Sequence, residues 1–310
     1  MNSIPNRQII CDALIAFGKI DRDILVLTSD SRGSASMTNF AKELPEQLIE
    51  VGIAEQNLVG IAAGLAASGK KPFVASPACF LTMRSIEQIK VDVAYSKTNV
   101  KLIGISGGVS YGALGMSHHS LQDLAVMRAI PGVAIVLPAD RFETKLAVEA
   151  LLVHKGPAYM RIGRNAVADV YQSEEYEFQI GKAVTLAEGK DLTIIATGEM
   201  VKVAVDSAVE LKHMGINCRV LNMHTIKPLD EEAIIKAARE TGKIITIEEH
   251  SIFGGLGSAV AEVVAQNHPA PVKILGILDE PAIAGKAQEV FAYYGLCVKN
   301  IKKIALELLK

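Results

Sequence analysis

Short, continuously apolar segments alternate with helix-like segments along almost the whole chain. In the first half, these segments are DILVLTSD (23–30), KPFVAS (71–76), NVKLIGIS (99–106) and GVAIVLPA (132–139). A strand that is apolar at nearly every position, rather than at every second one, is typical of a parallel sheet with helices on both faces. The alternation therefore predicts an α/β fold with mainly parallel sheets.

The same alternation resumes after a polar segment, which predicts a second domain. The segment GRNAVADVYQSEEYEFQI (163–180) is polar, and its charges cluster at SEEYE. Four further apolar segments follow it, at 191–198, 217–224, 243–250 and 272–277. A chain of 310 residues can hold two cores, since a domain has about 150 residues. We expect two doubly wound domains, at 1–165 and 181–310, joined by a linker at 166–180.

Composition and charge exclude several classes of protein. The formal net charge is −2 and there is no tryptophan, so we expect no basic, aromatic surface for nucleic acid. The apolar segments have the length of strands and are too short to cross a membrane. The N-terminal segment MNSIPNRQIICDALIAFGKIDRD has no apolar secretion core. We expect a cytoplasmic protein with no nucleic-acid and no membrane partner.

The four cysteines and seven histidines give no sign of a metal site. The cysteines are far apart and form no CxxC pair, and the histidines form no HxxxH or HExxH pattern. Reduced, buried cysteines are typical of a cytoplasmic chain. We therefore expect no metal site built by this chain alone.

The segment VGIAEQNLVGIAAGLAASG (51–69) places Glu55 at the start of a strongly apolar helix. One interpretation is local, because the helix macrodipole favours negative charge in the first turn. However, the rest of this helix has almost no polar face, so its start should adjoin a packed interior or an interface. A carboxyl group there would have a raised pKa and could exchange protons near neutral pH.

A second segment with a candidate ligand-binding role is SPACFLTMRSIEQIKVDVA (76–94). Phe80, Met83 and Ile86 recur there at every third residue and form one apolar stripe. Such a stripe is more often part of a core than the wall of a pocket for an aromatic ring. From spacing alone, the core is the preferred interpretation.

The glycine-rich loop SGGVSYGALGMSHH (106–119) has the sequence of neither a P-loop nor a dinucleotide site. Glycines after a strand nevertheless suit the rim of an active site in a parallel sheet. His118 and His119 end the loop, and only one of them is expected to point inward. Arg7 and Arg161 could form salt bridges or hold a phosphate, since a guanidinium group matches a phosphate.

One glycine-rich segment in the second half has a structural interpretation. In EEHSIFGGLGSAVAE (248–262), the sequence GGLG precedes a predicted helix and could bind an ion. A tight turn from a strand to a closely packed helix is the preferred interpretation.

Taken together and in this order, these segments resemble the C-terminal portion of transketolase, meaning its pyrimidine-binding domain followed by its C-terminal domain. The resemblance covers nearly all 310 residues. It rests on VGIAEQNLVGIAAGLAASGKKPFVASPACFL, GALGMSHHSLQDLAVMRAIPGVAIVLPAD and GPAYMRIGR, and then on IATG and EEHSIFGGLGSAV. It implies an enzyme that transfers a two-carbon ketol unit from a phosphorylated ketose to an aldose with thiamine diphosphate as cofactor.

The resemblance implies a cofactor-binding role for five residues. Glu55 matches the family glutamate that hydrogen-bonds the aminopyrimidine ring of thiamine diphosphate and helps to activate it. Phe80 matches the phenylalanine that stacks on the pyrimidine. Met83 and Ile86 fall where the family places further pocket residues, and Asp30 in LTSDSRG falls near an active-site aspartate.

The resemblance also implies substrate contacts, with two departures. His118 matches a catalytic histidine that contacts the substrate, and Arg7 and Arg161 match the arginines that hold the substrate phosphate. Leu114 replaces an aspartate that reads the sugar hydroxyls, and Ser106 replaces a histidine at the phosphate end. Both replacements leave the identity of the substrate open, while the arginines favour a sugar phosphate.

The family's diphosphate-binding half, with its GDG motif and Mg²⁺ ligands, has no counterpart in this sequence. The resemblance therefore implies one half of a split transketolase, which shares thiamine diphosphate with an N-terminal diphosphate-binding subunit. That partner would supply most of the Mg²⁺ ligands. A self-dimer of this chain within an α₂β₂ heterotetramer is the expected assembly.

Two other functions stay open from the sequence. The first is the beta subunit of a 2-oxo-acid dehydrogenase, or a chain like deoxyxylulose-phosphate synthase, because EEH…GGLGSAV is common to these relatives. The second is a non-catalytic scaffold subunit that has kept the fold. Retention of Glu55, Phe80, His118 and both arginines argues against a scaffold, which needs none of them.

Overall fold

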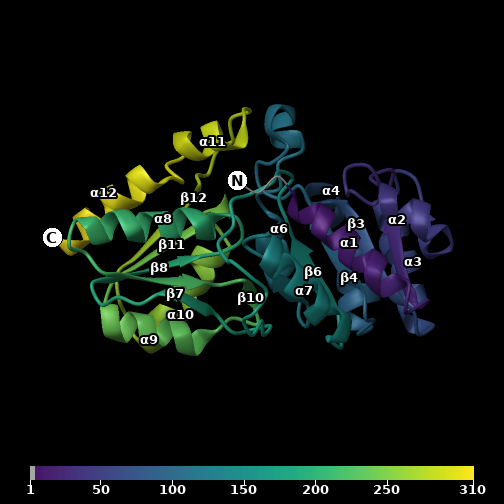
Figure 1. Cartoon of the computed structure of the whole chain (residues 1–310), viewed down its shortest axis with the longest axis horizontal. Coiled ribbons are helices and arrows are strands. Elements are labelled where there is room, and N and C mark those ends of the chain that lie inside the picture. The colour runs from purple at the N-terminus through teal and green to yellow at the C-terminus, as the bar shows by residue number, and fades with distance from the viewer. Residues whose placement is uncertain (1–3) are drawn as a thin grey trace.

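The computed structural model describes residues 4–310, which form two mainly parallel β-sheets placed side by side (Figure 1). The strands of the first sheet are β1 (Ile24–Thr28), β2 (Leu48–Glu50), β3 (Lys71–Pro77), β4 (Lys101–Ile105), β5 (Ala134–Val136), β6 (Ala158–Arg161) and β10 (Thr225–Lys227). Their order across the sheet is β10-β5-β6-β4-β3-β1-β2. Within the described residues, each neighbouring pair is parallel except β10 with β5.

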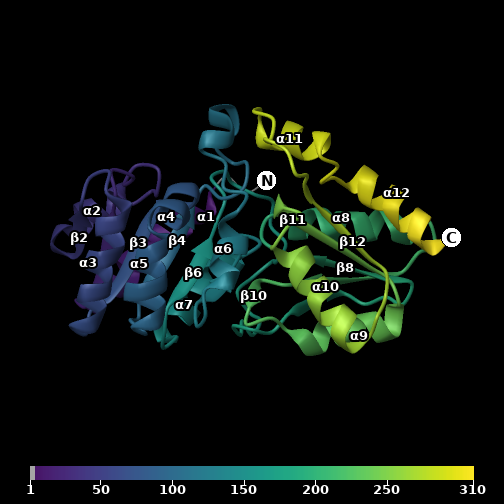
Figure 2. The ribbon, with the colours of Figure 1, turned by 180° about the vertical axis from the view of Figure 1, so that it is seen from behind.

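Helices cover both faces of the first sheet. In chain order they are α1 (Asn6–Gly18), α2 (Thr38–Glu43), η1 (Pro45–Gln47), α3 (Glu55–Ala67), α4 (Ala78–Arg84), α5 (Ile86–Gln88), η2 (Ile89–Tyr95), η3 (Gly112–Ser117), α6 (Asp123–Ala129) and α7 (Arg141–Val153). Helices α1 and α7 pack together on one face (Figure 1). Helices α3, α4 and α6 lie on the opposite face (Figure 2).

The strands of this sheet contribute side chains to two cores, one on each face of the sheet. Successive residues of a strand point to opposite faces. In β1, Leu25 and Leu27 belong to the core under α3, whereas Ile24 and Val26 belong to the core under α1. Because both faces are buried, nearly every position of such a strand must be apolar. This is the pattern from which the α/β class was predicted, and the prediction is confirmed.

The second sheet has the strand order β12-β11-β8-β9-β7 in the part of the chain that the structure describes. Its strands are β7 (Val184–Ala187), β8 (Leu192–Ala196), β9 (Cys218–Asn222), β11 (Ile244–Ser251) and β12 (Val272–Ile277). Its helices are α8 (Met200–His213), α9 (Glu231–Thr241), α10 (Leu256–Asn267), α11 (Ala287–Tyr293) and α12 (Val298–Leu309). Helices α8 and α12 pack on one face and α9 and α10 on the other (Figure 1).

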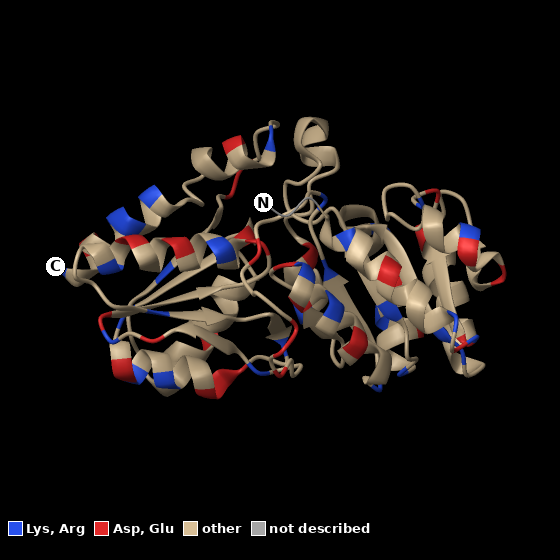
Figure 3. Cartoon of the chain, viewed as in Figure 1, with Lys and Arg blue, Asp and Glu red and all other residues tan. Residues whose placement is uncertain are grey.

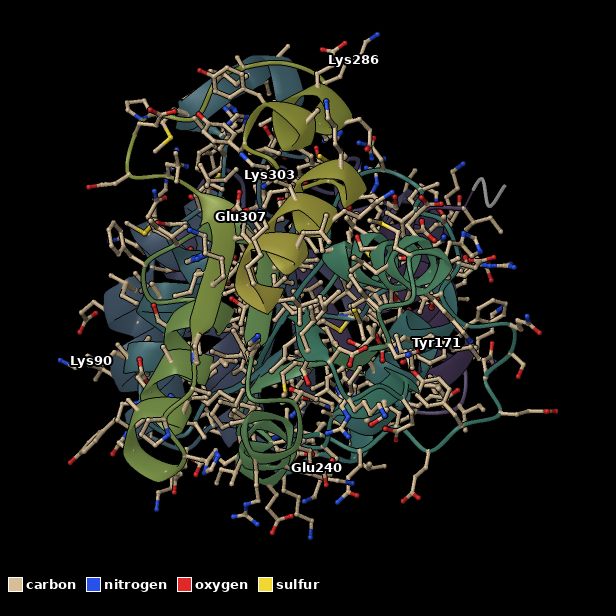
Figure 4. The ribbon with its side chains drawn as sticks, turned by 90° about the vertical axis from the view of Figure 1, so that its left-hand side faces the viewer. Lys90, Tyr171, Glu240, Lys286, Lys303 and Glu307 are labelled. Carbon is tan, nitrogen blue, oxygen red and sulfur yellow. The ribbon has the colours of Figure 1, made fainter. Side chains whose placement is uncertain are left out.

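The C-terminal helix α12 shows how sequence periodicity sets packing. Ile301, Ile304 and Ala305 recur at helical spacing and are buried against α8. Lys303 and Glu307 lie one turn apart on the outer face, 3.9 Å from each other (Figure 4). Among residues 4–310, no helix is long and apolar enough to cross a membrane.

The two halves are joined by more than the connecting segment. Residues 166–180 contain no helix or strand, and Asp140 Oδ2 accepts hydrogen bonds from the backbone N–H groups of Val170 and Tyr171 at 2.7 and 2.8 Å. In addition, β10 of the second half pairs with β5 of the first. We propose that the first domain ends at residue 165 and that the second begins at residue 181. Strand β10 belongs to the second half of the chain but joins the sheet of the first domain.

Glu143 of α7 links the two halves through buried hydrogen bonds. Its carboxylate accepts from Asn222 Nδ2 at 2.8 Å and from the Ala139 N–H at 2.7 Å. Tyr176, in the connecting segment, donates to the same carboxylate at 3.0 Å. Burial raises the pKa of Glu143 to about 7. The carboxyl group therefore holds α7, β9 and the connecting segment together.

Candidate functional site

A cleft of about 470 Å³ lies at the carboxyl edge of the first sheet. The segments that follow β1, β2, β3, β4 and β6 form its walls, and this edge is where open parallel sheets bind ligands. Asp30, Glu55, Phe80 and His118 line it, as four of the predicted site residues. The structure thus brings together residues from four separate parts of the sequence.

Glu55 begins α3 and is only 4 % exposed, although it lines the cleft. The helix N-terminus favours its negative charge. Its Oε1 atom accepts a hydrogen bond from Arg84 Nη1 at 2.9 Å, which is also an ion pair. Its Oε2 atom has no hydrogen-bond partner among the described residues. One oxygen is therefore anchored by the protein and the other is available to a ligand.

Glu50, at the end of β2, fixes the loops that carry Asp30 and Glu55. Its carboxylate accepts from the Asp30 N–H at 2.6 Å, from the Gly52 N–H at 3.1 Å and from Thr28 Oγ1 at 2.7 Å. Burial alone would raise the pKa of Glu50, but these hydrogen bonds lower it on balance. Asp30 has a φ of 53°, which is uncommon for a residue other than glycine and is found at many functional sites.

Three rings meet at one wall of the cleft. The ring of His118 meets Phe80 edge to face, with centroids 5.2 Å apart, and Tyr111 in the same way at 5.3 Å. Nδ1 of His118 lies 3.0 Å from Ser117 Oγ, which leaves Nε2 for a ligand. His119 is buried and lines a neighbouring cavity instead. The loop that carries Tyr111 and His118 projects beyond the sheet and has no charged residue (Figure 3).

Two arginines form a cationic end of the site. Arg164 lines the cleft, 5.1 Å from the ring centroid of Tyr111. Arg7 lies beside it and donates to the Ser34 carbonyl oxygen at 2.7 Å. Burial, and then the nearby charge of Arg164, lowers the pKa of Arg7. Arg7 Nε and Arg164 Nη1 are buried without a hydrogen-bond partner in the described chain. Neighbouring guanidinium groups with unused donors are suited to bind an anion.

Arg161 does not reach this cleft. It ends β6 in the interior and is 5 % exposed. Its Nε atom lies 3.2 Å from Asp123 Oδ2, and its Nη2 atom donates to the Glu249 carbonyl oxygen at 2.6 Å. Burial raises the pKa of the nearby Glu249 carboxyl group to about 7, and the positive charge of Arg161 opposes this rise. Arg161, which the sequence analysis expected to hold a phosphate, therefore lies outside the cleft, whereas Arg164 lines it.

The apolar stripe of α4 and α5 divides between site and core. Phe80 lines the cleft, whereas Met83 is 52 % exposed and lines the neighbouring cavity of about 240 Å³. Ile86, which was expected in the cofactor pocket, packs against the core under α3 and does not line the cleft. Leu114 lines the cleft and is 54 % exposed, while Ser106 is fully buried.

Arg84 is the most central residue that the sequence analysis missed. It lies one helical turn after Phe80 in α4, and its guanidinium carbon is 4.0 Å from the centroid of that ring. A basic residue four positions after an aromatic one was a usable signal, because such residues are neighbours on a helix. Tyr111 gave no comparable signal, since its position depends on the loop conformation.

The glycine-rich segment of the second half is a structural turn. Glu248 accepts hydrogen bonds from the N–H groups of Leu256 and Gly257 at 2.7 and 2.8 Å and so caps the start of α10. A Cβ atom at Gly255 would lie 2.0 Å from Glu248 Oε2, so glycine is required there. These contacts agree with the tight turn expected from the sequence.

Family models assign both halves of the chain. The model of the transketolase pyrimidine-binding domain matches residues 2–169, and that of the transketolase C-terminal domain matches residues 181–301. The chain belongs to the transketolase family. The cleft described above lies in the pyrimidine-binding domain of this family.

Curated relatives resemble the chain over almost its whole length. An apulose-4-phosphate transketolase subunit of Phocaeicola vulgatus is 54% identical over 309 residues, which are 100% of this chain and 99% of the relative. A 6-deoxy-6-sulfo-D-fructose transketolase subunit of a Clostridium species is 40% identical over 301 residues, covering 97% and 93%. The chain is therefore similar to separate transketolase subunits from end to end.

Solved structures show the same relationship. A split-gene transketolase, described as an inactive beta4 tetramer, has a TM-score of 0.91 at 38% identity and covers 99% of this chain and 98% of its own. The transketolase of Campylobacter jejuni has a TM-score of 0.80 at 22% identity, and the chain spans 47% of it. The second match supports the fold alone.

Among the three functions considered from the sequence, the transketolase subunit is the one that the comparisons support. Two relatives that the chain spans almost completely, at 99% and 93% of their length, are named transketolase subunits. The 1-deoxy-D-xylulose-5-phosphate synthase of Heliobacterium modesticaldum is 37% identical, and the chain spans 46% of its length. The chain is thus a subunit of the transketolase type, in a family of transferases.

Proposed function

We propose that this chain binds the pyrimidine end of thiamine diphosphate in a split transketolase. The assembled enzyme transfers a two-carbon ketol unit from a phosphorylated ketose to an aldose in the cytoplasm. The observation that carries the proposal is the buried carboxylate of Glu55, which presents one unpaired oxygen to a cleft beside the ring of Phe80. Such a pair of groups recognises a flat heterocycle that carries an N–H donor.

The cleft fits an aminopyrimidine in size and chemistry. Glu55 Oε2 supplies the acceptor, Phe80 supplies an aromatic ring, and Ile53, which is 74 % exposed, supplies an apolar contact. The bound cofactor supplies a nucleophilic carbon and an electron sink. Glu55 would exchange a proton with the ring nitrogen, and Phe80 would fix the plane of the ring.

The diphosphate and most of the Mg²⁺ coordination are assigned to a partner subunit. Within residues 4–310, no group of three or more His, Cys, Asp or Glu side chains could hold a metal ion. The partner in this proposal is the N-terminal, diphosphate-binding transketolase subunit. The cofactor would then lie between the two chains and bind firmly only when both are present.

The cationic end of the cleft supports an anionic sugar as substrate. Arg7 and Arg164 offer unused donors, and His118, which lines the same cleft, has Nε2 available for a ligand. We propose that the arginines hold the terminal phosphate and that His118 contacts a substrate oxygen. The relatives are named for apulose 4-phosphate and for a sulfonated fructose, which both carry a terminal anion.

An α₂β₂ heterotetramer with a self-dimer of this chain is the proposed assembly. The structural neighbour at 38% identity forms an inactive tetramer of beta chains, which supports self-association and dependence on a second subunit. Exposed apolar side chains around the cleft support coverage by a partner. Ile53 is 74 % exposed, Leu114 54 % and Met83 52 %.

Calorimetric titration of thiamine diphosphate with Mg²⁺ tests the proposal. The titrations use this chain alone and then mixed with a candidate diphosphate-binding subunit. We expect firm binding only in the mixture. Firm binding to the isolated chain would contradict the shared site.

Replacement of the acid tests its assigned role in the mixture. Glu55→Gln should reduce ketol transfer at least about 10²-fold, because proton exchange is lost. The matched control is Glu46→Gln, since Glu46 is an acid with a side chain 84% exposed outside the cleft. Full activity of Glu55→Gln would refute the role of Glu55.

A further inference from the structure

Arg84 connects the two groups on which the proposed cofactor site depends. It ends α4, whereas Glu55 begins α3, so its ion pair at 2.9 Å joins two helices. The same guanidinium group lies 4.0 Å from the ring centroid of Phe80. Guanidinium is planar and weakly hydrated, and it therefore stacks on a ring while it donates in its own plane. One side chain thus holds both the acid and the aromatic ring.

The ion pair makes the two oxygens of Glu55 different. Oε1 receives the hydrogen bond from Arg84, and Oε2 receives none from the described residues. The Glu55 side chain is 5% exposed and the Arg84 side chain 47%. A carboxylate with so little contact to water keeps its charge only beside a positive partner or several donors. Arg84 is the residue that supplies this partner.

The other charged groups of the cleft do not take this place. Asp30, His118 and Arg164 line the same cleft from other loops, and so does Tyr111. Within residues 4–310, Arg84 is the group that forms an ion pair or side-chain hydrogen bond with the Glu55 carboxylate. Arg84 is therefore the side chain that holds the Glu55 carboxylate in place.

We propose that Arg84 is a positioning residue that anchors one oxygen of Glu55 and turns the free oxygen toward the pyrimidine. This inference rests on the proposed function and deepens it. An ionised carboxylate can only accept a hydrogen bond. The site then selects the form of the pyrimidine that carries a proton on the ring nitrogen, and Arg84 acts through Glu55 without touching reacting atoms.

A double-mutant cycle on the free chain tests the pairing without any cofactor. Arg84→Met, Glu55→Gln and the double variant are melted at pH 5 and at pH 8. A buried carboxyl group without a partner favours its neutral form, so Arg84→Met should lose stability as the pH rises. We expect a fall in Tm of about 5 °C at pH 8 and much less at pH 5, with little effect of Arg84→Met when Glu55 is already Gln.

The control for the cycle is Arg22→Met, because Arg22 forms an ion pair with Glu46 in which both side chains are at least 84% exposed. That variant should show no such dependence on pH. Additive effects of the substitutions at 84 and 55, equal at both pH values, would overturn the inference.

Cofactor affinity in the mixture with the diphosphate-binding subunit gives a second readout. Arg84→Met should raise the Kd for thiamine diphosphate about 10-fold, and Arg84→Lys should restore part of it, because it keeps the charge but not the flat stack. Tighter binding by Arg84→Met would overturn the inference, since Arg84 would then compete with the pyrimidine. If the wild-type mixture binds no cofactor, the proposed function fails, while the cycle on the free chain still decides the pairing.

Discussion

Replacing Arg161 and Arg164 in turn separates a structural arginine from a ligand-binding one. Arg161→Met removes the positive partner of Asp123, which lies 3.2 Å away with a fully buried side chain. The same change removes the hydrogen bond to the Glu249 carbonyl oxygen at 2.6 Å, which ties the first domain to the second. Tyr159 Oη, at 2.7 Å from Asp123, would be its remaining side-chain donor.

The magnitude follows from burial. Removing one partner of a buried ion pair costs about 3–5 kcal/mol, because the other charge stays uncompensated. At about 2 °C per kcal/mol for a chain of this size, the Tm of Arg161→Met should fall by roughly 6–10 °C. Arg164 has no acidic partner among the described residues and lines the open cleft. Its replacement should therefore change Tm by no more than about 2 °C.

The assay compares thermal unfolding of the free chains with the KM for a phosphorylated donor in the reconstituted enzyme. Arg164→Met should raise that KM at least about 10-fold, as expected from the loss of a charge-assisted contact to phosphate. Arg161→Met should mainly lower stability. An Arg161→Met chain with unchanged Tm but a strongly raised KM would refute the placement of both residues.

Two further predictions concern the interior. Burial raises the pKa of Glu143 from 4.5 to about 7, so the native state binds this proton more firmly than the unfolded state does. The proton therefore adds about 3 kcal/mol to the free energy of unfolding below pH 4.5, and this contribution is lost as the pH rises to 7. Urea unfolding at pH 5 and 8 should show this loss in the wild type and a smaller one in Glu143→Gln. The same pH dependence of the free energy of unfolding in both proteins would contradict the prediction. Gly108 has a φ of 60°, and an added Cβ atom would lie 2.2 Å from Glu249 Cδ. Gly69 also has a positive φ, of 87°, but open space surrounds it. Gly108→Ala should therefore lower Tm by several degrees more than Gly69→Ala. Equal losses in Tm would show that backbone strain alone matters.

Most of the fold could be predicted from the sequence because buried parallel strands have a strong pattern. The eight apolar segments quoted from the sequence correspond to β1, β3, β4, β5, β8, β9, β11 and β12. The strands β2 and β10 have three residues each and no continuous apolar run, so no such pattern marks them. β10 joins the first sheet from the second half of the chain, and that pairing depends on how the two domains dock.

The candidate site was predictable where a motif fixes the residue and not where packing decides it. Glu55 and Phe80 lie in helices that follow strands of one sheet, so their approach at its carboxyl edge follows from the fold. Arg161 and Arg164 are three residues apart, and nothing local decides which faces the cleft. Arg161 is drawn inward by Asp123 and by Glu249, 88 residues later in the chain. That contact forms only when the two domains meet.

Unpaired polar atoms distinguish a ligand site from an interior network in this chain. Around Arg161 and Glu199, such atoms lie beside a small pocket of about 20 Å³, which is too small for an organic ligand. Around Glu55, Arg7 and Arg164, the unused acceptor and donors gather at a cleft of about 470 Å³. Leaving buried donors unpaired costs free energy, so their concentration at an open cleft favours a ligand that pairs them. An unused acceptor and cationic donors at one cleft are the complement of ligands with an N–H group and an anion, as in the proposed complex of cofactor and sugar phosphate.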